Sequence, residues 1–152
     1  MAREDAVATL LRADATLAGI LTGGIYTSGQ VGRVGISRET TPAAFDANGW
    51  LKPCALVKQR GNVPDGMVRD SAPVVVSAAQ VVEIWLYQDS GYSTLDSAMT
   101  RILTLLEGTT VDSGAFPAQL SNVIDRQRDE GALAGCSLAR MDFVVFSIIE
   151  GA

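Results

Sequence analysis

The chain has 152 residues, of which 47% are hydrophobic and 19% charged, a globular composition that excludes a chain disordered throughout. The length is that of one domain, so we expect a single domain over residues 1–152. A net charge of -5, with twelve scattered basic residues, argues against nucleic-acid binding as the main activity, because such binding draws on clustered Lys and Arg.

Apolar runs in the sequence are too short for a membrane span. The longest is interrupted by Gln80 and Glu83, so none reaches the roughly 20 residues that a spanning helix needs. Residues 1–5 lead into a patterned helix and lack the apolar core of a signal peptide. We therefore expect no membrane partner and residence in a cytoplasm.

Apolar residues repeat at helical spacing over residues 3–21, which predicts one long N-terminal helix. Its apolar stripe comprises Ala6, Val7, Leu10, Leu11, Leu17, Ile20 and Leu21. Gly23 and Gly24 are expected to end the helix before a short strand at residues 25–27. They lack the Gly-Lys-Ser/Thr of a phosphate-binding loop, so we interpret them as a helix stop.

Residues 28–50 show neither helical nor strand periodicity and are rich in Gly, Ser and Thr. An irregular excursion of this length inside a domain is expected to be mobile or to be ordered by a partner. Phe45 and Trp50 are the exceptions to its polarity. Two interpretations stay open for them: they fold back onto the domain, or they anchor a protein interface.

A β-hairpin is predicted next, with strands at residues 54–60 and 72–87 joined by a turn-rich connection of about ten residues. The second strand is apolar on both parities. It is therefore expected to be central and covered on both faces, by helices or by a neighbouring subunit. Asp65, Arg69 and Asp70 fall in the connection, which we expect to project as a loop, and are candidate interface residues.

A turn at residues 88–91 precedes a second helix, predicted over residues 93–107 from apolar residues that recur every three or four positions. Ser93 and Asp96 resemble a capping box with Asp in place of Glu, so the helix is expected to begin there. Gly108 is placed to cap its C-terminus.

A second hairpin is predicted to end the pattern, with a strand at residues 120–126, a hairpin end at 126–131 and a long strand at 136–149. Arg126 and Arg128 carry positive charge at the hairpin end and are candidate interface residues.

The last of these strands is apolar on both parities but contains Arg140 and Asp142 on one of them. We interpret these two residues as the point where that strand becomes solvated. The order of elements, α-β-β-β-α-β-β, predicts an α+β fold: a mixed, mainly antiparallel sheet of about four to five strands with two main helices packed on it.

No residue pattern indicates catalysis. The chain has no histidine, and it lacks a Gly-x-Ser-x-Gly elbow and a dinucleotide-binding fingerprint. Asp125, Asp129 and Glu130 cluster beside two arginines and are interpreted as a solvated hairpin tip. Cys54 and Cys136 are expected to be buried thiols, since zinc requires four ligands. We therefore predict no enzyme, no cofactor and no metal site.

The order of several segments resembles the tail-terminator and tail-completion proteins of long-tailed, siphovirus-type bacteriophages. The segments that carry the resemblance are LAGILTGGIY at residues 17–26, PAAF at 42–45, KPCALV at 52–57, VEIWLY at 82–87, Gly91-Tyr92, and the helix from Leu95 to Gly108. Together they cover most of the chain. The order of the elements and the strand-Gly-Tyr-helix join carry the resemblance.

The resemblance implies a structural virion protein that assembles in the host cytoplasm as a homohexameric ring on the head-proximal end of the tail tube. Such a ring ends tube growth and presents a surface to the head-completion or stopper protein of the neck. Genomic DNA would pass through its lumen without specific binding, and a net acidic protein suits that passage.

Two other interpretations stay open. One is another neck or tube protein of the same particle, such as a stopper or a tail tube subunit. The other is a small cytoplasmic enzyme or ligand-binding α+β domain, which would need a pocket with convergent polar groups.

Overall fold

The computed structural model describes residues 3–60, 63–64, 74–112, 115–128, 133 and 135–151. Its helices are α1 (Arg3–Arg12), α2 (Ala15–Ile20), α3 (Ser28–Val31) and α4 (Ser93–Leu106), with a 3-10 turn η1 (Pro42–Ala44). Its strands are β1 (Ile25–Thr27), β2 (Cys54–Gln59), β3 (Val63–Pro64), β4 (Val74–Gln88), β5 (Gln119–Arg128) and β6 (Ser137–Gly151).

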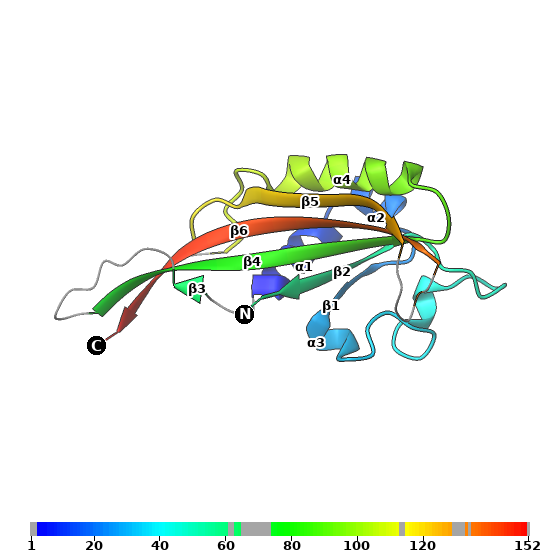
Figure 1. The fold of residues 1–152 in the computed structure, drawn as a ribbon, viewed down its shortest axis with the longest axis horizontal. Coiled ribbons are helices and arrows are strands. Elements are labelled where there is room, and N and C mark those ends of the chain that lie inside the picture. The colour runs from blue at the N-terminus through cyan, green and yellow to red at the C-terminus, as the bar shows by residue number, and fades with distance from the viewer. Residues whose placement is uncertain are drawn as a thin grey trace.

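The strands form one sheet in the order β1-β2-β4-β6-β5, and β3 pairs with β4 outside this path (Figure 1). β1 runs parallel to β2, and every other pairing is antiparallel. The predicted α+β class, with its mixed and mainly antiparallel sheet and two main helices, is confirmed. The predicted β2–β4 hairpin is also present, although β2 pairs only with residues 82–87 of β4.

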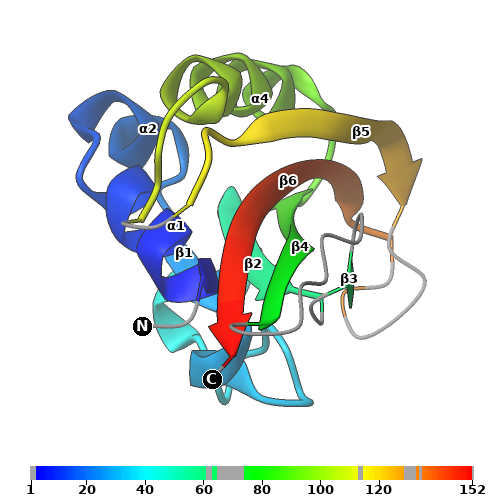
Figure 2. The same cartoon turned by 90° about the vertical axis from the view of Figure 1, so that its left-hand side faces the viewer.

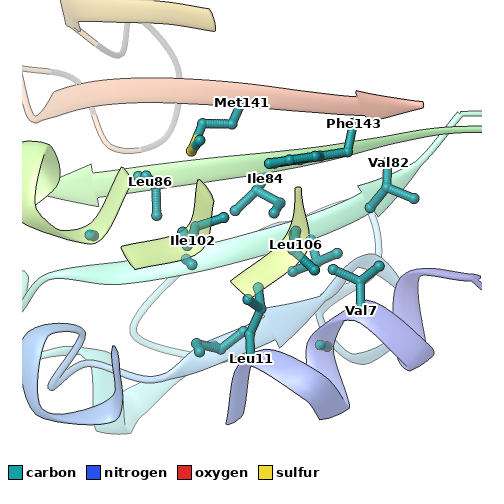
Figure 3. Packing of buried hydrophobic residues seen from close by; sticks show 14 of the residues in the cluster. Val7, Leu11, Val82, Ile84, Leu86, Ile102, Leu106, Met141 and Phe143 are labelled. Atoms are coloured by element: carbon teal, nitrogen blue, oxygen red, sulfur yellow. The ribbon is translucent and has the colours of Figure 1, made fainter. Parts of the chain in front are cut away.

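The main core lies between one face of this curved sheet and the helices α1, α2 and α4 (Figure 2). The sheet contributes alternate residues of its strands to this core. Val82, Ile84 and Leu86 of β4 lie on the same face of the strand and are all fully buried. Met141 and Phe143 of β6 lie beside them, and side chains from α1 and α4 point toward them from the helical layer (Figure 3).

The opposite face of the sheet is covered at one end by the excursion at residues 28–50. Val31, Ile36 and Ala44 are buried there against Leu56 and Tyr87, which have the opposite parity from the main core. The segment also has regular structure, namely α3 and η1. Much of this excursion is therefore ordered by the chain's own second core, and no partner is needed to order that part.

The N-terminal helix is not continuous, which corrects the prediction for residues 3–21. Asp14 has extended backbone torsions, and its Oδ2 accepts a hydrogen bond from the Leu17 N–H at 2.9 Å, so it caps a new helix, α2. Arg101 on α4 donates to both oxygens of the same carboxylate, from Nε at 2.9 Å and Nη2 at 2.6 Å. The cap thus also ties α2 to α4.

The predicted capping box of α4 is wrong. The N-cap residue is Tyr92, and the side chain that satisfies a free N–H of the first turn is Gln88, whose Oε1 accepts from the Leu95 N–H at 3.2 Å. Gly108 was placed correctly: it follows the helix with φ of 74°, a conformation that glycine adopts at little cost.

β4 and β6 pair along their whole lengths, from Val74 opposite Gly151 to Gln88 opposite Ser137. The end that contains Val74 extends beyond the helical layer, and the C-terminus lies at its tip (Figure 1). Among the helices of the described residues, none is long and apolar enough to span a membrane.

The core predicts a clear contrast between two adjacent residues of α4. Ile102 is fully buried, whereas Leu103 is 38% exposed. We expect Ile102→Ala to lower the free energy of unfolding by about 2–5 kcal/mol, because it removes buried methyl groups and leaves a cavity. Leu103→Ala should change it by less than about 0.5 kcal/mol. Urea denaturation of both variants measures the difference, and equal losses would contradict the described core.

The cap and its arginine partner predict a pH dependence. Hydrogen bonds from Arg101 and from the Leu17 N–H lower the pKa of Asp14 from 3.8 to about 2. The pKa of Asp14 is lower in the folded state than in the unfolded state. The resulting stabilisation is therefore complete above about pH 5 and is lost as the pH falls from there toward the folded-state pKa of about 2. Asp14→Asn, which can still cap α2, should lower the melting temperature at pH 7 but not near pH 2.

The control for this experiment is Asp125→Asn, at an exposed position on β5. That variant should melt like the wild type at both pH values. A loss for Asp14→Asn of the same size at pH 7 and pH 2 would show that the ion pair is not its cause.

Candidate interaction surfaces

The two aromatic residues of the excursion take different positions. Phe45 is half-buried, packs against the second core and pairs with Leu51 through an isolated β-bridge. Trp50 is 59% exposed. Phe45 thus folds back onto the domain, whereas Trp50 is free to contact another molecule.

A tight turn holds Trp50 outward. Asp46 Oδ1 accepts hydrogen bonds from the backbone N–H groups of Asn48 and Trp50, each at 2.9 Å. Gly49 completes the turn with φ of 81°, and its carbonyl accepts from Arg38 Nη2 at 2.8 Å. The Arg38 guanidinium also lies over the Phe45 ring, 5.6 Å from its centroid. Trp50 is therefore presented by an ordered turn.

Trp50 stands at a surface hollow of about 430 Å³, which we call the aromatic hollow. Its lining combines apolar residues with a few polar ones: Ser37, Arg38, Phe45, Gly49, Trp50, Leu51, Asp89, Leu133 and Cys136. It lies where the excursion meets the end of β4 and the start of β6. A shallow, mostly apolar hollow with an exposed tryptophan is typical of a protein contact.

Two further candidate residues, both on β5, do not line this hollow. Arg126 and Arg128 are exposed, but they belong to β5 itself and do not follow it. Arg126 sits at a β-bulge with φ of 53°, forms an ion pair with Asp96 at 2.9 Å and lies over the Tyr92 ring. It therefore fastens β5 to the start of α4. Asp65, Arg69 and Asp70 lie outside the described residues.

A charged cluster on the sheet face away from the helices was missed by the sequence interpretation. The register places Glu83 of β4 directly opposite Asp142 of β6, and Arg60 and Arg140 flank the two carboxylates. The Arg60 guanidinium lies 3.3 Å from both carboxylates, and Arg140 Nε lies 3.0 Å from Asp142 Oδ1. Asp142 is only 2% exposed.

This cluster corrects the interpretation of Arg140 and Asp142 as a solvated end of the last strand. Arg140 and Asp142 lie on the same face of the sheet as Glu83. Cross-strand pairing brings these three charged side chains together, so that opposite charges compensate each other. Trp85 completes it, with Lys58 Nζ 4.8 Å and Arg140 Cζ 5.2 Å from its ring centroid. The available signal was a pair of opposite charges at alternate positions, Arg140 and Asp142, within an apolar strand.

Two observations bear on the chemistry available at the hollow and the cluster. Burial raises the pKa of the Cys54 thiol to about 12, and the neighbouring Cys136 contributes to the shift, so Cys54 is a poor nucleophile at neutral pH. In the part of the chain that the structure describes, no group of three Cys, Asp or Glu side chains is placed to hold a metal ion. These surfaces suit contact with a macromolecule better than chemistry on a small one.

The charged cluster predicts a large effect for a small substitution. Asp142→Asn removes one of two carboxylates that compensate Arg60 and Arg140, and we expect a loss of about 3 kcal/mol in unfolding free energy, as for a broken buried ion pair. Asp125→Asn at the exposed position should change it by less than about 0.5 kcal/mol. Urea denaturation at pH 7 tests this, and a tolerated Asp142→Asn would show that the cluster is not a stabilising unit.

Comparison with known proteins bears on the fold. No protein-family model matches the sequence, and a search of curated proteins found no match. Among solved structures, a chain matches from one described as "Virion of native gene transfer agent (GTA) particle", with a TM-score of 0.55 and 20% sequence identity. The match covers 97% of this chain and 94% of that chain. The two chains therefore share a fold over nearly their full lengths.

Proposed function

We propose that this chain is a structural protein of a phage-like particle that forms a ring at the head-proximal end of the tail tube. The ring would end tube growth and present a joining surface to the neck proteins of the head. The observation that carries the proposal is the fold shared with a chain of a gene transfer agent virion, which extends over 97% of the present chain. The order of segments in the sequence supports the terminator role within such a particle.

Because one fold can serve many functions, the surfaces supply the second part of the argument. Trp50 is a large aromatic side chain held outward beside a mostly apolar hollow, which is the arrangement expected of an interface anchor. Arg126 and Arg128 add exposed charge along β5. We propose Trp50 and these two arginines as interface residues, together with Asp65, Arg69 and Asp70 of the connection. Phe45 folds back onto the domain but joins this proposal because it lines the hollow beside Trp50.

The charge of the chain fits the proposed position. A net charge of -5 per subunit would make a ring of several copies strongly acidic, and like charges repel DNA. DNA could then pass through the lumen without adhering to its wall. The partners proposed on this basis are further copies of the chain, the tail tube protein and the stopper or head-completion protein.

Particles assembled without this protein provide the test. We expect overlong tails or tails without heads in electron micrographs, because nothing would end tube growth or join the head. Wild-type protein supplied in trans should restore normal particles. Trp50→Glu should fail to restore them, whereas Leu103→Glu, a charge at an exposed apolar position on α4, should restore them.

Normal particles in the absence of the protein would rule out the proposed role. If the purified chain instead polymerised into open-ended tubes, it would be a tube subunit. Tails of normal length without heads would indicate a neck stopper.

A further inference from the structure

The two outer edges of the main sheet are closed by side chains. At β1, the Arg12 guanidinium donates from Nε at 2.9 Å and Nη2 at 2.7 Å to the Ile25 carbonyl, and Gln30 Oε1 accepts from the Thr27 N–H at 3.0 Å. These are the backbone groups that an added strand would use. Exposed edges of this kind are commonly protected against pairing with other chains.

The β5 edge is closed in the same way. Glu107 Oε2 accepts from the Leu120 N–H at 2.7 Å, and the Tyr92 hydroxyl donates to the Gln127 carbonyl at 2.8 Å. Two β-bulges interrupt the strand between these bonds. Strand addition at either outer edge would break existing bonds, so a contact between copies of the chain should use other surfaces.

Another part of the sheet extends away from the helices (Figure 1). Residues 74–78 of β4 pair with residues 147–151 of β6 and form a two-stranded ribbon beyond the helical layer (Figure 1). Within the described residues, β3 pairs with only one ribbon residue, Ala78, and the pairing of β5 with β6 begins at Val144. A two-stranded ribbon is marginally stable in water without a third strand or a packing surface.

The sequence of the ribbon is typical of strands that are buried against other apolar residues. Val74, Val75 and Val76 are consecutive on one strand, and Ile148 and Ile149 on the other. Glu150 is its one charged residue. Because consecutive residues of a strand alternate between its faces, such a run suits burial on both sides.

The aromatic hollow is a mostly apolar surface that could accept the ribbon. The ribbon of the same chain does not reach it. The hollow adjoins the far end of β4, since Asp89, which lines it, directly follows Gln88. Residues 79–88 of β4 lie between the ribbon and Asp89, and a strand rises about 3.3 Å per residue, so ribbon and hollow are separated by roughly 35 Å along the strand. Figure 1 shows the ribbon and the excursion at opposite ends of the long axis.

We propose that the ribbon of one copy docks in the aromatic hollow of the next copy. The apolar sequence of the ribbon suits the mostly apolar lining around Trp50. A contact between two different surfaces repeats head to tail, and it closes into a ring when the rotation between subunits permits. This inference rests on the proposed ring and assigns the contact that builds it.

Two variants test the contact. Trp50→Glu disables the hollow, and the double substitution Val75→Glu/Val76→Glu disables the ribbon. In sedimentation experiments on the purified full-length chain, each should raise the dissociation constant of self-association at least about thirtyfold, the effect of losing a central interface anchor. Leu103→Glu is the matched control and should associate like the wild type. Circular dichroism confirms that each variant is folded.

Mixing the two disabled variants gives the decisive result. Each retains one intact surface, so the mixture should form a one-to-one dimer and nothing larger, although neither variant associates alone. A contact between identical surfaces would give no such rescue. If the mixture stays monomeric, if the variants associate normally, or if the wild type is monomeric up to its solubility limit, the proposed contact is wrong.

A second readout keeps the test independent of charge repulsion. A photo-crosslinking amino acid in place of Trp50, in a mixture of isotopically light and heavy protein, should give light-heavy crosslinks to residues 74–78 or 147–151. Crosslinks confined to other segments would overturn the contact. Failure of this inference can be told apart from failure of the proposed function. If particles are normal without the protein, the proposed function is wrong. If tails are abnormal without the protein but neither variant weakens self-association, only the proposed contact is wrong.

Discussion

The pairing of β4 with β6 is the constraint on which the rest of the structure depends. Fifteen residues of each strand face one another without a shift in register. This register places Val82, Ile84 and Leu86 beside Met141 and Phe143 on the helical side and sets Glu83 against Asp142 on the other. A slip of one residue would exchange the two faces, so an apolar surface would meet water and the charges would enter the core.

The charged cluster makes that slip especially unfavourable. Two carboxylates side by side would repel each other, and Arg60 and Arg140 compensate them only in the observed register. Such groups contribute less to stability than apolar residues of equal volume, because removing charge from water is costly. Our hypothesis is that this cluster is kept for register specificity, which matters most for two long strands that are apolar on both parities.

Much of the fold could be predicted from the sequence, because periodicity and turn residues report on local structure. The long strands, α4 and the glycine after it were recognised on that basis. The helix break at Asp14 could not be recognised, because the apolar stripe continues across it. The break depends on the hydrogen bond that Asp14 accepts from the Leu17 N–H and on its pairing with Arg101, which is distant in sequence. The start of α4 at Ser93 was also recognised, but its capping side chain was not, because Gln88, which accepts from the Leu95 N–H, precedes the local Ser93 signal.

The candidate surfaces could likewise be predicted only where they depend on local sequence. Trp50 was recognisable as an aromatic residue in a polar segment, but the hollow beside it is built from segments far apart in the chain. Arg140 and Asp142 were misjudged because a charge in a strand carries no information about what stands opposite on the next strand. Register is a tertiary property, and the charged cluster depends on it.

The contrast between the two cysteines has a practical consequence. Cys54 is fully buried, and burial raises the pKa of its thiol to about 12, so the reactive thiolate is strongly disfavoured there at neutral pH. Cys136 is half-buried and lines the aromatic hollow. A maleimide fluorophore or spin label should therefore attach at Cys136 alone, and the natural chain carries its own reporter of whatever occupies that surface.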